Sequence, residues 1–245
     1  MHRIDLNCDL GEGAGQDAEL MPLITSANIA CGAHAGDAAT MRAIAALAQR
    51  HGVAIGAHPG YADSEHFGRR ELSLPPAQVR ELVRSQIEAI RALAPLQYVK
   101  LHGALYNQAA RDTGLAEVIA ETVRAMNPSL MVFVLPDSAL ARAAAARGLR
   151  IANEVFADRT YQRDGSLTPR SRPEALIQDE REAVAQVLRM IREGLVRATD
   201  GTDVPIRADT VCLHGDGPNP VAFARRLREA LHAAGVEVVA FGPAA

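Results

Sequence analysis

Short apolar runs rich in β-branched residues alternate with longer segments of helical periodicity along the whole chain of 245 residues. We expect strands near residues 3–8, 26–31, 53–57, 98–102, 131–135, 150–156, 210–214 and 236–241. We expect helices near residues 38–51, 76–94, 113–126, 138–147, 174–196 and 219–234. Strands that are separated by helices must pair in parallel, because a tight turn cannot return the chain in the same direction.

The number of strand–helix units narrows the choice of architecture. Seven or eight units follow one another without a linker rich in Pro, Gly or Ser. This pattern predicts a single α/β domain spanning residues 1–245, folded as a parallel (βα)7–8 barrel. A doubly wound open sheet is the alternative architecture.

Composition excludes several classes of protein. The formal net charge of −3 leaves no basic excess for binding nucleic acid. No apolar stretch approaches the roughly 20 residues of a membrane span, and the N-terminal MHRIDLNCDLGEG lacks the apolar region of a signal peptide. The three cysteines lie in apolar runs, as reduced and buried thiols do. We therefore expect a cytoplasmic protein that contacts neither membrane nor nucleic acid.

Four histidines end predicted strands, each flanked by small residues: His34, His58, His102 and His214. In a parallel barrel the loops that follow the strands all open on one face, where active sites of such barrels lie. One such histidine is typical of a satisfied core residue, but four in the same position favour a site. The other four histidines occupy terminal, helix-end, loop or helix-surface positions.

Further polar residues are predicted to lie on the same face. Lys100, the only lysine among 26 basic residues, precedes His102 by two positions. The remaining candidates lie at or just beyond predicted strand ends: Asp9, Glu12, Asp37, Asn107, Glu154, Asp158, Arg159 and Asp216. Alternatives remain open here, since Asp9 suits a turn, Glu12 suits a solvated loop, and Asp158 with Arg159 suits either an ion pair or an anion clamp. Two long polar loops, 58–75 and 157–173, also follow strands, as lids and binding loops do.

Several well-defined motifs are missing from the sequence. It has no GxxxxGK[ST] or GxGxxG phosphate loop, no HExxH or paired CxxC zinc motif, and no GxSxG nucleophile elbow. The remaining acid–base groups suit the addition of water to a carbonyl, with a carboxylate or imidazole as base and a cation on the oxyanion. A divalent metal is compatible with six residues of suitable ligand type: Asp9, His34, His58, His102, His214 and Asp216. Sequence spacing does not show which of them would bind it.

Eight ordered blocks resemble those of the bacterial lactam-utilisation family, whose members are the A subunits of 5-oxoprolinase. They are IDLNCDLGEG, SANIACGAHAGD, GVAIGAHPGY, FGRR, VKLHGALYN, EVFADRTY, DGSLTPR and CLHGDGP. The resemblance implies a distorted βα barrel related to the sugar deacetylase and glycoside hydrolase-like barrels. It also implies ATP-dependent hydrolytic opening of 5-oxoproline (pyroglutamate) to L-glutamate, with two partner subunits, B and C.

The resemblance and the strand-end positions together define the candidate site. As catalytic residues we expect Asp9, Lys100, His102 and His214. As substrate-binding residues we expect Glu12, His34, His58, Asn107, Asp158, Arg159 and Asp216. Our mechanistic hypothesis is that Lys100 and Arg159 hold a phosphoryl or carboxylate group while Asp9 or His102 activates water.

Two other functions compete with this interpretation. A metal-dependent, deacetylase-like hydrolase acting alone would use the same histidines. A non-catalytic protein would merely position substrate for its partners. The sequence leaves open whether ATP binds this chain or a partner.

Overall fold

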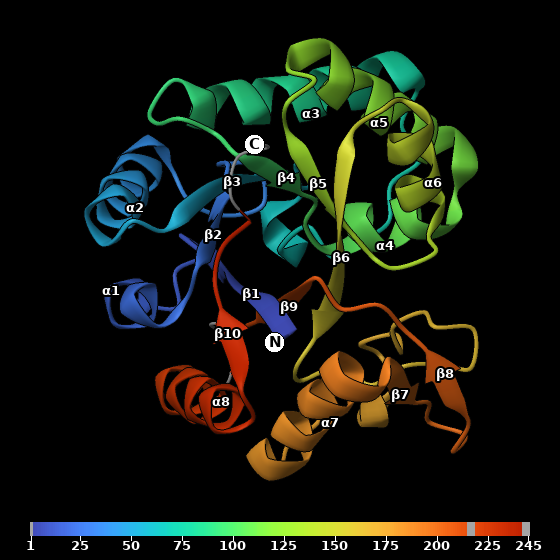
Figure 1. The fold of residues 1–245 in the computed structure, drawn as a ribbon. Coiled ribbons are helices and arrows are strands. Elements are labelled where there is room, and N and C mark those ends of the chain that lie inside the picture. Colours follow the sequence, from blue (N-terminus) through green and yellow to red (C-terminus); the bar gives the residue numbers. More distant parts are fainter. Residues whose placement is uncertain (1, 215–218, 242–245) are drawn as a thin grey trace.

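The strands form a closed parallel barrel in the computed structural model, which describes residues 2–214 and 219–241 (Figure 1). Seven strands make up the ring: β1 (His2–Leu10), β2 (Ser26–Ala30), β3 (Ala54–His58), β4 (Tyr98–Lys100), β5 (Met131–Val134), β6 (Arg150–Phe156) and β9 (Thr210–Leu213). Each pairs in parallel with the next, and β9 pairs with both β6 and β1. The ring is therefore closed, as the predicted barrel requires, and the open-sheet alternative is wrong.

The predicted eighth strand lies beside the ring instead of within it. β10 (Val236–Val238) pairs with β1 at His2–Ile4, whereas β9 pairs with the following part of β1, Asp5–Cys8. A short antiparallel hairpin, β7 (Leu195–Arg197) with β8 (Asp203–Pro205), was not predicted. Strands of three residues are too short to show an alternating pattern.

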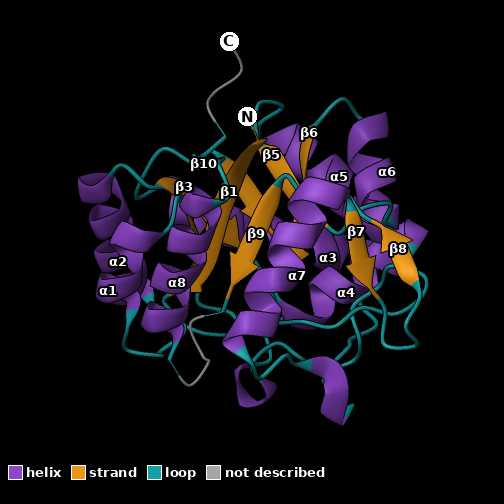
Figure 2. Cartoon of the chain, turned by 60° about the horizontal axis from the view of Figure 1, so that its bottom comes forward, coloured by secondary structure: helices purple, strands orange, loops and turns teal. Residues whose placement is uncertain are grey.

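Helices surround the barrel (Figure 2). They are α1 (Asp17–Leu20), α2 (Ala38–His51), α3 (Pro76–Arg91), α4 (Gly103–Arg111), α5 (Thr113–Met126), α6 (Ala139–Ala146), α7 (Glu180–Glu193) and α8 (Pro220–Ala233). The four-residue α1 and the nine-residue α4 were not predicted. Among the helices described, none is long and apolar enough to cross a membrane.

The helix expected at 174–196 begins later than its apolar pattern suggested. Asp179 caps α7, because its side chain accepts hydrogen bonds from the backbone N–H groups of Arg181 and Glu182. The preceding segment instead forms a 3-10 turn (Pro173–Ala175) and an isolated bridge to Arg159. This segment thereby belongs to the long loop that follows β6.

The interior of the barrel contains a row of polar side chains. Along β1, Leu6, Cys8 and Leu10 belong to the apolar core, while Asp5, Asn7 and Asp9 join buried hydrogen bonds inside the ring. Asn28 of β2 is central to this network, since it donates to Asn7 at 2.7 Å and to Asp9 at 2.8 Å. Strand alternation therefore directs alternate side chains of β1 to the helices and to the interior.

One glycine makes room for an aromatic ring in this interior. A Cβ atom on Gly56 of β3 would lie 2.1 Å from Cε2 of Tyr98. The Tyr98 hydroxyl in turn donates a 2.7 Å hydrogen bond to Asn28, and its ring stacks on Phe133. Tyr98 therefore fills part of the barrel interior and contacts the row of polar side chains through Asn28.

Candidate active site

Three of the four strand-end histidines meet in one cluster. His58 ends β3, His102 precedes α4, and His34 lies in the turn after β2. They converge on Glu12, whose Oε1 atom lies 3.1 Å from His34 Nε2, 3.2 Å from His102 Nδ1 and 3.6 Å from His58 Nε2. The three imidazoles are almost fully buried. Residues from four segments of the chain thus build one compact group.

Backbone carbonyls fix the orientation of two of these rings. Nδ1 of His58 lies 2.9 Å from the carbonyl oxygen of Lys100, and Nε2 of His102 lies 2.8 Å from that of Phe67. A carbonyl only accepts, so both of these ring nitrogens carry hydrogen. The opposite nitrogens, His58 Nε2 and His102 Nδ1, then face each other at 3.0 Å.

Lys100 lies beside this cluster, between two buried carboxylates. Its Nζ is 2.6 Å from Asp9 Oδ1 and 3.0 Å from Glu154 Oε1. Asn7 and Cys212 complete its surroundings, at 3.2 and 3.0 Å. The ammonium therefore offsets the charge of two carboxylates, of which Glu154 is fully buried and Asp9 lines the cavity.

The charges of this group stabilise one another. Burial by itself favours the neutral amine, but Asp9 and Glu154 raise the pKa of Lys100 well above its usual value. Burial likewise opposes ionisation of Asp9, but His58 and Lys100 hold the pKa of this carboxyl well below its usual range. Asp9 is therefore an ionised acceptor and a weak base.

The histidines differ in their affinity for protons. Burial lowers the pKa of His34 to about 4 and also lowers the pKa of His102, despite hydrogen bonding to Glu12. Burial acts in the same direction on His58, but the Asp9 carboxylate outweighs it and raises the pKa of His58. Burial would also raise the pKa of Glu12, yet its contacts with the imidazoles of His102 and His34 lower this pKa overall.

His214 lines the same cavity, and one of its ring nitrogens lies within 4.8 Å of a carboxylate oxygen of Asp9. Its Nδ1 lies 2.8 and 2.9 Å from the two carboxylate oxygens of Asp158, and its Nε2 lies 3.2 Å from a guanidinium nitrogen of Arg170. Nδ1 therefore donates to Asp158, and Nε2 presents a lone pair. This arrangement is the one that orients a general base.

A cavity of about 600 Å³ joins the two groups. It is lined by Asp9, Glu12, His58, Lys100, His102 and His214 and by several arginines, including Arg159 and Arg170. The cavity lies where the loops after the strands meet, as the barrel predicts.

Other predicted site residues have different surroundings. Arg159 is buried, and its guanidinium donates to the carbonyls of Thr168 and Ala175, so it fastens the loop that forms one wall of the cavity. Asn107 lines the cavity from the exposed side of α4 and donates to Gly103 one turn earlier. Asp216 lies outside the described residues. The side chain of Asp37 caps α2 by accepting from the Thr40 N–H.

Sequence reasoning passed over several residues of the site. Asn7 and Asn28 hold Asp9 and Lys100 in place, and Arg170 contacts His214. A Cβ on Gly68 would lie 2.9 Å from His34 Cβ, so the long loop after β3 packs directly on the histidines. The alternation of Asp5, Asn7 and Asp9 with apolar residues was the signal for an interior polar row.

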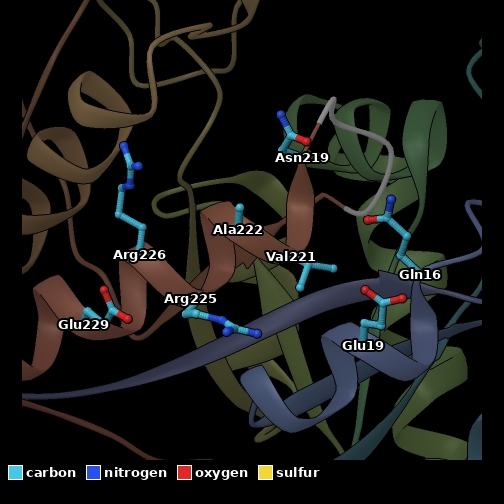
Figure 3. A pocket seen from close by; sticks show the side chains of 8 residues that line it. All are labelled: Gln16, Glu19, Asn219, Val221, Ala222, Arg225, Arg226 and Glu229. Carbon is cyan, nitrogen blue, oxygen red and sulfur yellow. The ribbon is translucent and has the colours of Figure 1, made fainter.

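A second cavity, of about 540 Å³, lies between α1 and α8 (Figure 3). Its charged lining residues, Glu19, Arg225, Arg226 and Glu229, lie at the surface, and Arg226 pairs with Glu180. It contains neither a buried charge nor a histidine among its lining residues. The strand-end cavity is therefore the candidate active site.

Comparison with known proteins agrees with this geometry. The sequence pattern of the LamB/YcsF family matches residues 4–245. The chain belongs to the LamB/YcsF family. Relatives named as the A subunit of 5-oxoprolinase include those of Neisseria meningitidis serogroup A, 51% identical over 98% of this chain and 100% of the relative, and of Geobacillus kaustophilus, 53% identical over 98% and 97%.

Solved structures support both the family and the barrel. The lactam utilization protein from Thermus thermophilus is 47% identical with a TM-score of 0.91, covering 98% of this chain and 100% of that one. A family 4 carbohydrate esterase from Streptomyces lividans aligns with a TM-score of 0.52 at 12% identity, over 99% of this chain and 94% of that one. The second likeness concerns the fold alone. The predicted resemblance to the lactam-utilisation family is confirmed, as is the deacetylase-like barrel.

Proposed function

We propose that this chain supplies the hydrolytic centre of a 5-oxoprolinase that opens 5-oxoproline to L-glutamate, coupled to ATP hydrolysis and assembled with subunits B and C. The observation that carries this proposal is full-length identity of 50–53% to proteins named as the A subunit of 5-oxoprolinase. The strand-end cavity supports it, because it combines acid–base groups with several cationic side chains.

The cavity suits a small anionic lactam. Arg69, Arg111, Arg159 and Arg170 line it, and clefts with positive walls concentrate anionic ligands. Arg170 is exposed and lies beside His214, so its guanidinium is placed to receive the carboxylate of 5-oxoproline. Arg159 then acts by holding the loop, in place of the direct anion contact expected from the sequence.

The general base is assigned to His214. Asp158 orients its ring so that Nε2 faces the cavity, and a substrate carboxylate that draws Arg170 away would leave this lone pair to accept a proton from water. Asp9 suits this task less, because Lys100 and Asn28 already occupy its Oδ1 atom. Hydrolysis breaks the ring C–N bond, the carbonyl carbon gains a hydroxyl, and the ring nitrogen gains a proton.

ATP has a chemical reason to take part. A five-membered lactam is an unreactive amide, and phosphorylation of its oxygen by ATP, with release of ADP, would make the ring carbon a far better electrophile. Attack of water and cleavage of the ring C–N bond would then leave an acyl phosphate of glutamate, and a second water would release inorganic phosphate and L-glutamate. In this mechanism the cationic wall of the cavity stabilises the negative charge of the phosphoryl group.

Reconstitution tests the proposal. Glutamate release from 5-oxoproline and ATP is measured for this chain alone, for subunits B and C, and for the complete mixture. We expect release from the complete mixture only. Release by B and C without this chain would instead support a substrate-positioning role. No release from any mixture would overturn the proposal, and deacetylation of sugars by this chain alone would then favour the metal-dependent hydrolase.

Variants of the base refine the test. In the complete mixture, His214→Gln should lower kcat by about 10²–10⁴-fold, the range for loss of a general base. His51→Gln, at the exposed end of α2, is the matched control and should leave kcat unchanged.

A further inference from the structure

We propose that Glu12, His58 and His102 bind a first-row divalent cation, with Zn²⁺ the best fit, on the wall of the strand-end cavity. The proposal does not depend on which substrate occupies that cavity. It specifies a ligand set and a coordination geometry that sequence spacing did not provide.

The distances between the three donor atoms match one face of a coordination tetrahedron. Glu12 Oε1, His58 Nε2 and His102 Nδ1 form a triangle with edges of 3.0, 3.2 and 3.6 Å. Zinc bonds of ~2.0–2.2 Å to nitrogen and oxygen give tetrahedral edges of about 3.3–3.5 Å. An ion therefore fits just above the plane of this triangle, in contact with all three atoms, without movement of the backbone.

The hydrogen-bonding pattern of the two histidines requires a proton or a metal ion between them. Because His58 Nδ1 and His102 Nε2 donate to backbone carbonyls, the opposite nitrogens carry lone pairs and lie only 3.0 Å apart. The Glu12 carboxylate adds a third acceptor. Such a group of acceptors is repulsive unless a proton or a metal ion lies among them.

The surroundings favour a metal ion over a proton. Histidines that bind a metal almost always donate their second N–H to a carbonyl or carboxylate, as both do here. The ring of His34 stacks on that of His102 at 3.7 Å with an angle of 3° between the planes, so one ion cannot lie in both ring planes. His34 instead donates from Nε2 to Glu12 and thereby orients this ligand.

The fourth side of the site is open to the cavity. Glu12, His58 and His102 all line it, and Asp9 Oδ2 lies 3.4 Å from His58 Nε2. Three protein ligands with an open position are typical of catalytic zinc sites, where water or substrate takes the fourth place. Two imidazoles and a carboxylate also accept Mn²⁺ or Co²⁺, but they do not select Mg²⁺ or Ca²⁺.

Metal titration of the intact chain tests the site without reference to activity. The protein is treated with a chelator, dialysed, and titrated calorimetrically with Zn²⁺, while Co²⁺ is followed by its visible absorption. We expect a single tight ion per chain and the intense Co²⁺ absorption of a tetrahedral site. Glu12→Gln and His102→Gln should each weaken Zn²⁺ binding by on the order of 100-fold or more, and His34→Gln by about 10–100-fold.

Matched surface variants give the control. Glu19→Gln and His51→Gln alter exposed residues of the same types and should bind Zn²⁺ as the parent chain does. Circular dichroism of each variant checks that its fold is intact. No stoichiometric binding of any of these ions by the parent chain would overturn the proposal. Unchanged Zn²⁺ affinity in the folded variants Glu12→Gln and His102→Gln would overturn it as well. Neither result bears on glutamate release, so the two proposals fail separately.

Discussion

Lys100 shows how strongly one residue depends on its environment. Its side chain is almost fully buried, and its Nζ lies within 3.0 Å of carboxylate oxygens of both Asp9 and Glu154. An ammonium suits this place better than a guanidinium, because it is a compact charge that reaches several acceptors from one atom. Glu154 is fully buried, so its charge relies on this contact.

Lys100→Met should therefore destabilise the fold at neutral pH. Removal of one partner of a buried ion pair leaves an uncompensated charge and costs about 3–5 kcal/mol. Urea denaturation measures this loss. The double variant Lys100→Met/Glu154→Gln also removes one of the two carboxylates that have lost their cationic partner, and it should recover part of the stability. Equal stability of the single variant and the parent would contradict the structural role of the ion pair.

Asp5 predicts a pH dependence of stability. Burial raises its pKa to about 6, although hydroxyl groups of Ser26, Thr210 and Thr25 hydrogen-bond to it. The folded chain then binds more protons at this site than the unfolded chain between about pH 4 and pH 6. The contribution of Asp5 to stability is thus lost as the pH rises through that window.

Asp5→Asn cannot ionise and should escape this loss. Relative to the parent chain, its free energy of unfolding should rise between about pH 4 and pH 7 by up to about 3 kcal/mol. Chemical denaturation of both proteins across this pH range measures the difference. A difference that is constant with pH, or that falls as the pH rises, would be inconsistent with a raised pKa in the folded chain.

At the scale of elements, Arg159 is one of several side chains that hold the loop after β6 in place. Arg159 donates to Thr168 and Ala175, and isolated bridges join Arg159 to Leu176 and Tyr161 to Leu167. The loop carries Asp158 and Arg170, which both contact His214. The conformation of this loop therefore determines the surroundings of His214, the proposed general base.

Arg159→Lys should loosen this loop while leaving the barrel intact. A lysine lacks the forked donors that reach two carbonyls, and loss of a charged hydrogen bond costs about 1.5–3 kcal/mol. Opening of the loop, measured by the rate of tryptic cleavage at Arg163 and Arg170, should increase roughly tenfold or more. Arg42→Lys, on the exposed face of α2, should not change the rate. Unaltered cleavage in Arg159→Lys would remove this role from the arginine.

At the scale of the whole molecule, the barrel closes where its first and last ring strands pair. Cys8 of β1 lies opposite Leu213 of β9, and Cys212 lies opposite Asn7. Both thiols are fully buried, and burial raises their pKa values well above the usual range. These two thiols therefore report on opening of the ring itself.

Thiol labelling should accordingly follow global unfolding. We expect Cys8 and Cys212 to react only at the rate at which the whole barrel unfolds, and Cys31, 6% exposed just after β2, to react faster through local opening. Pulse labelling followed by peptide mass spectrometry measures each site. Rapid labelling of Cys212 in the native protein would mean that β9 detaches from β1 without global unfolding.

The sequence by itself determined the class of fold and the position of the candidate site. Apolar periodicity is local, so it located the ring strands, and the parallel rule placed their ends on one face with Asp9, His58, Lys100 and His102. Eight ordered motifs were enough for the family, because each is a specific string of residues.

Only the tertiary structure decided how those residues are partnered. Pairing of β1 with β9 joins positions about 200 residues apart, and no local pattern specifies that contact. Three histidines gather around Glu12, whereas His214 pairs with Asp158. This division likewise depends on the position of each strand in the ring. So does the fastening of the loop by Arg159, whose guanidinium reaches the carbonyls of Thr168 and Ala175. Distances and hydrogen-bond directions, which assign these chemical roles, exist only once the ring has closed.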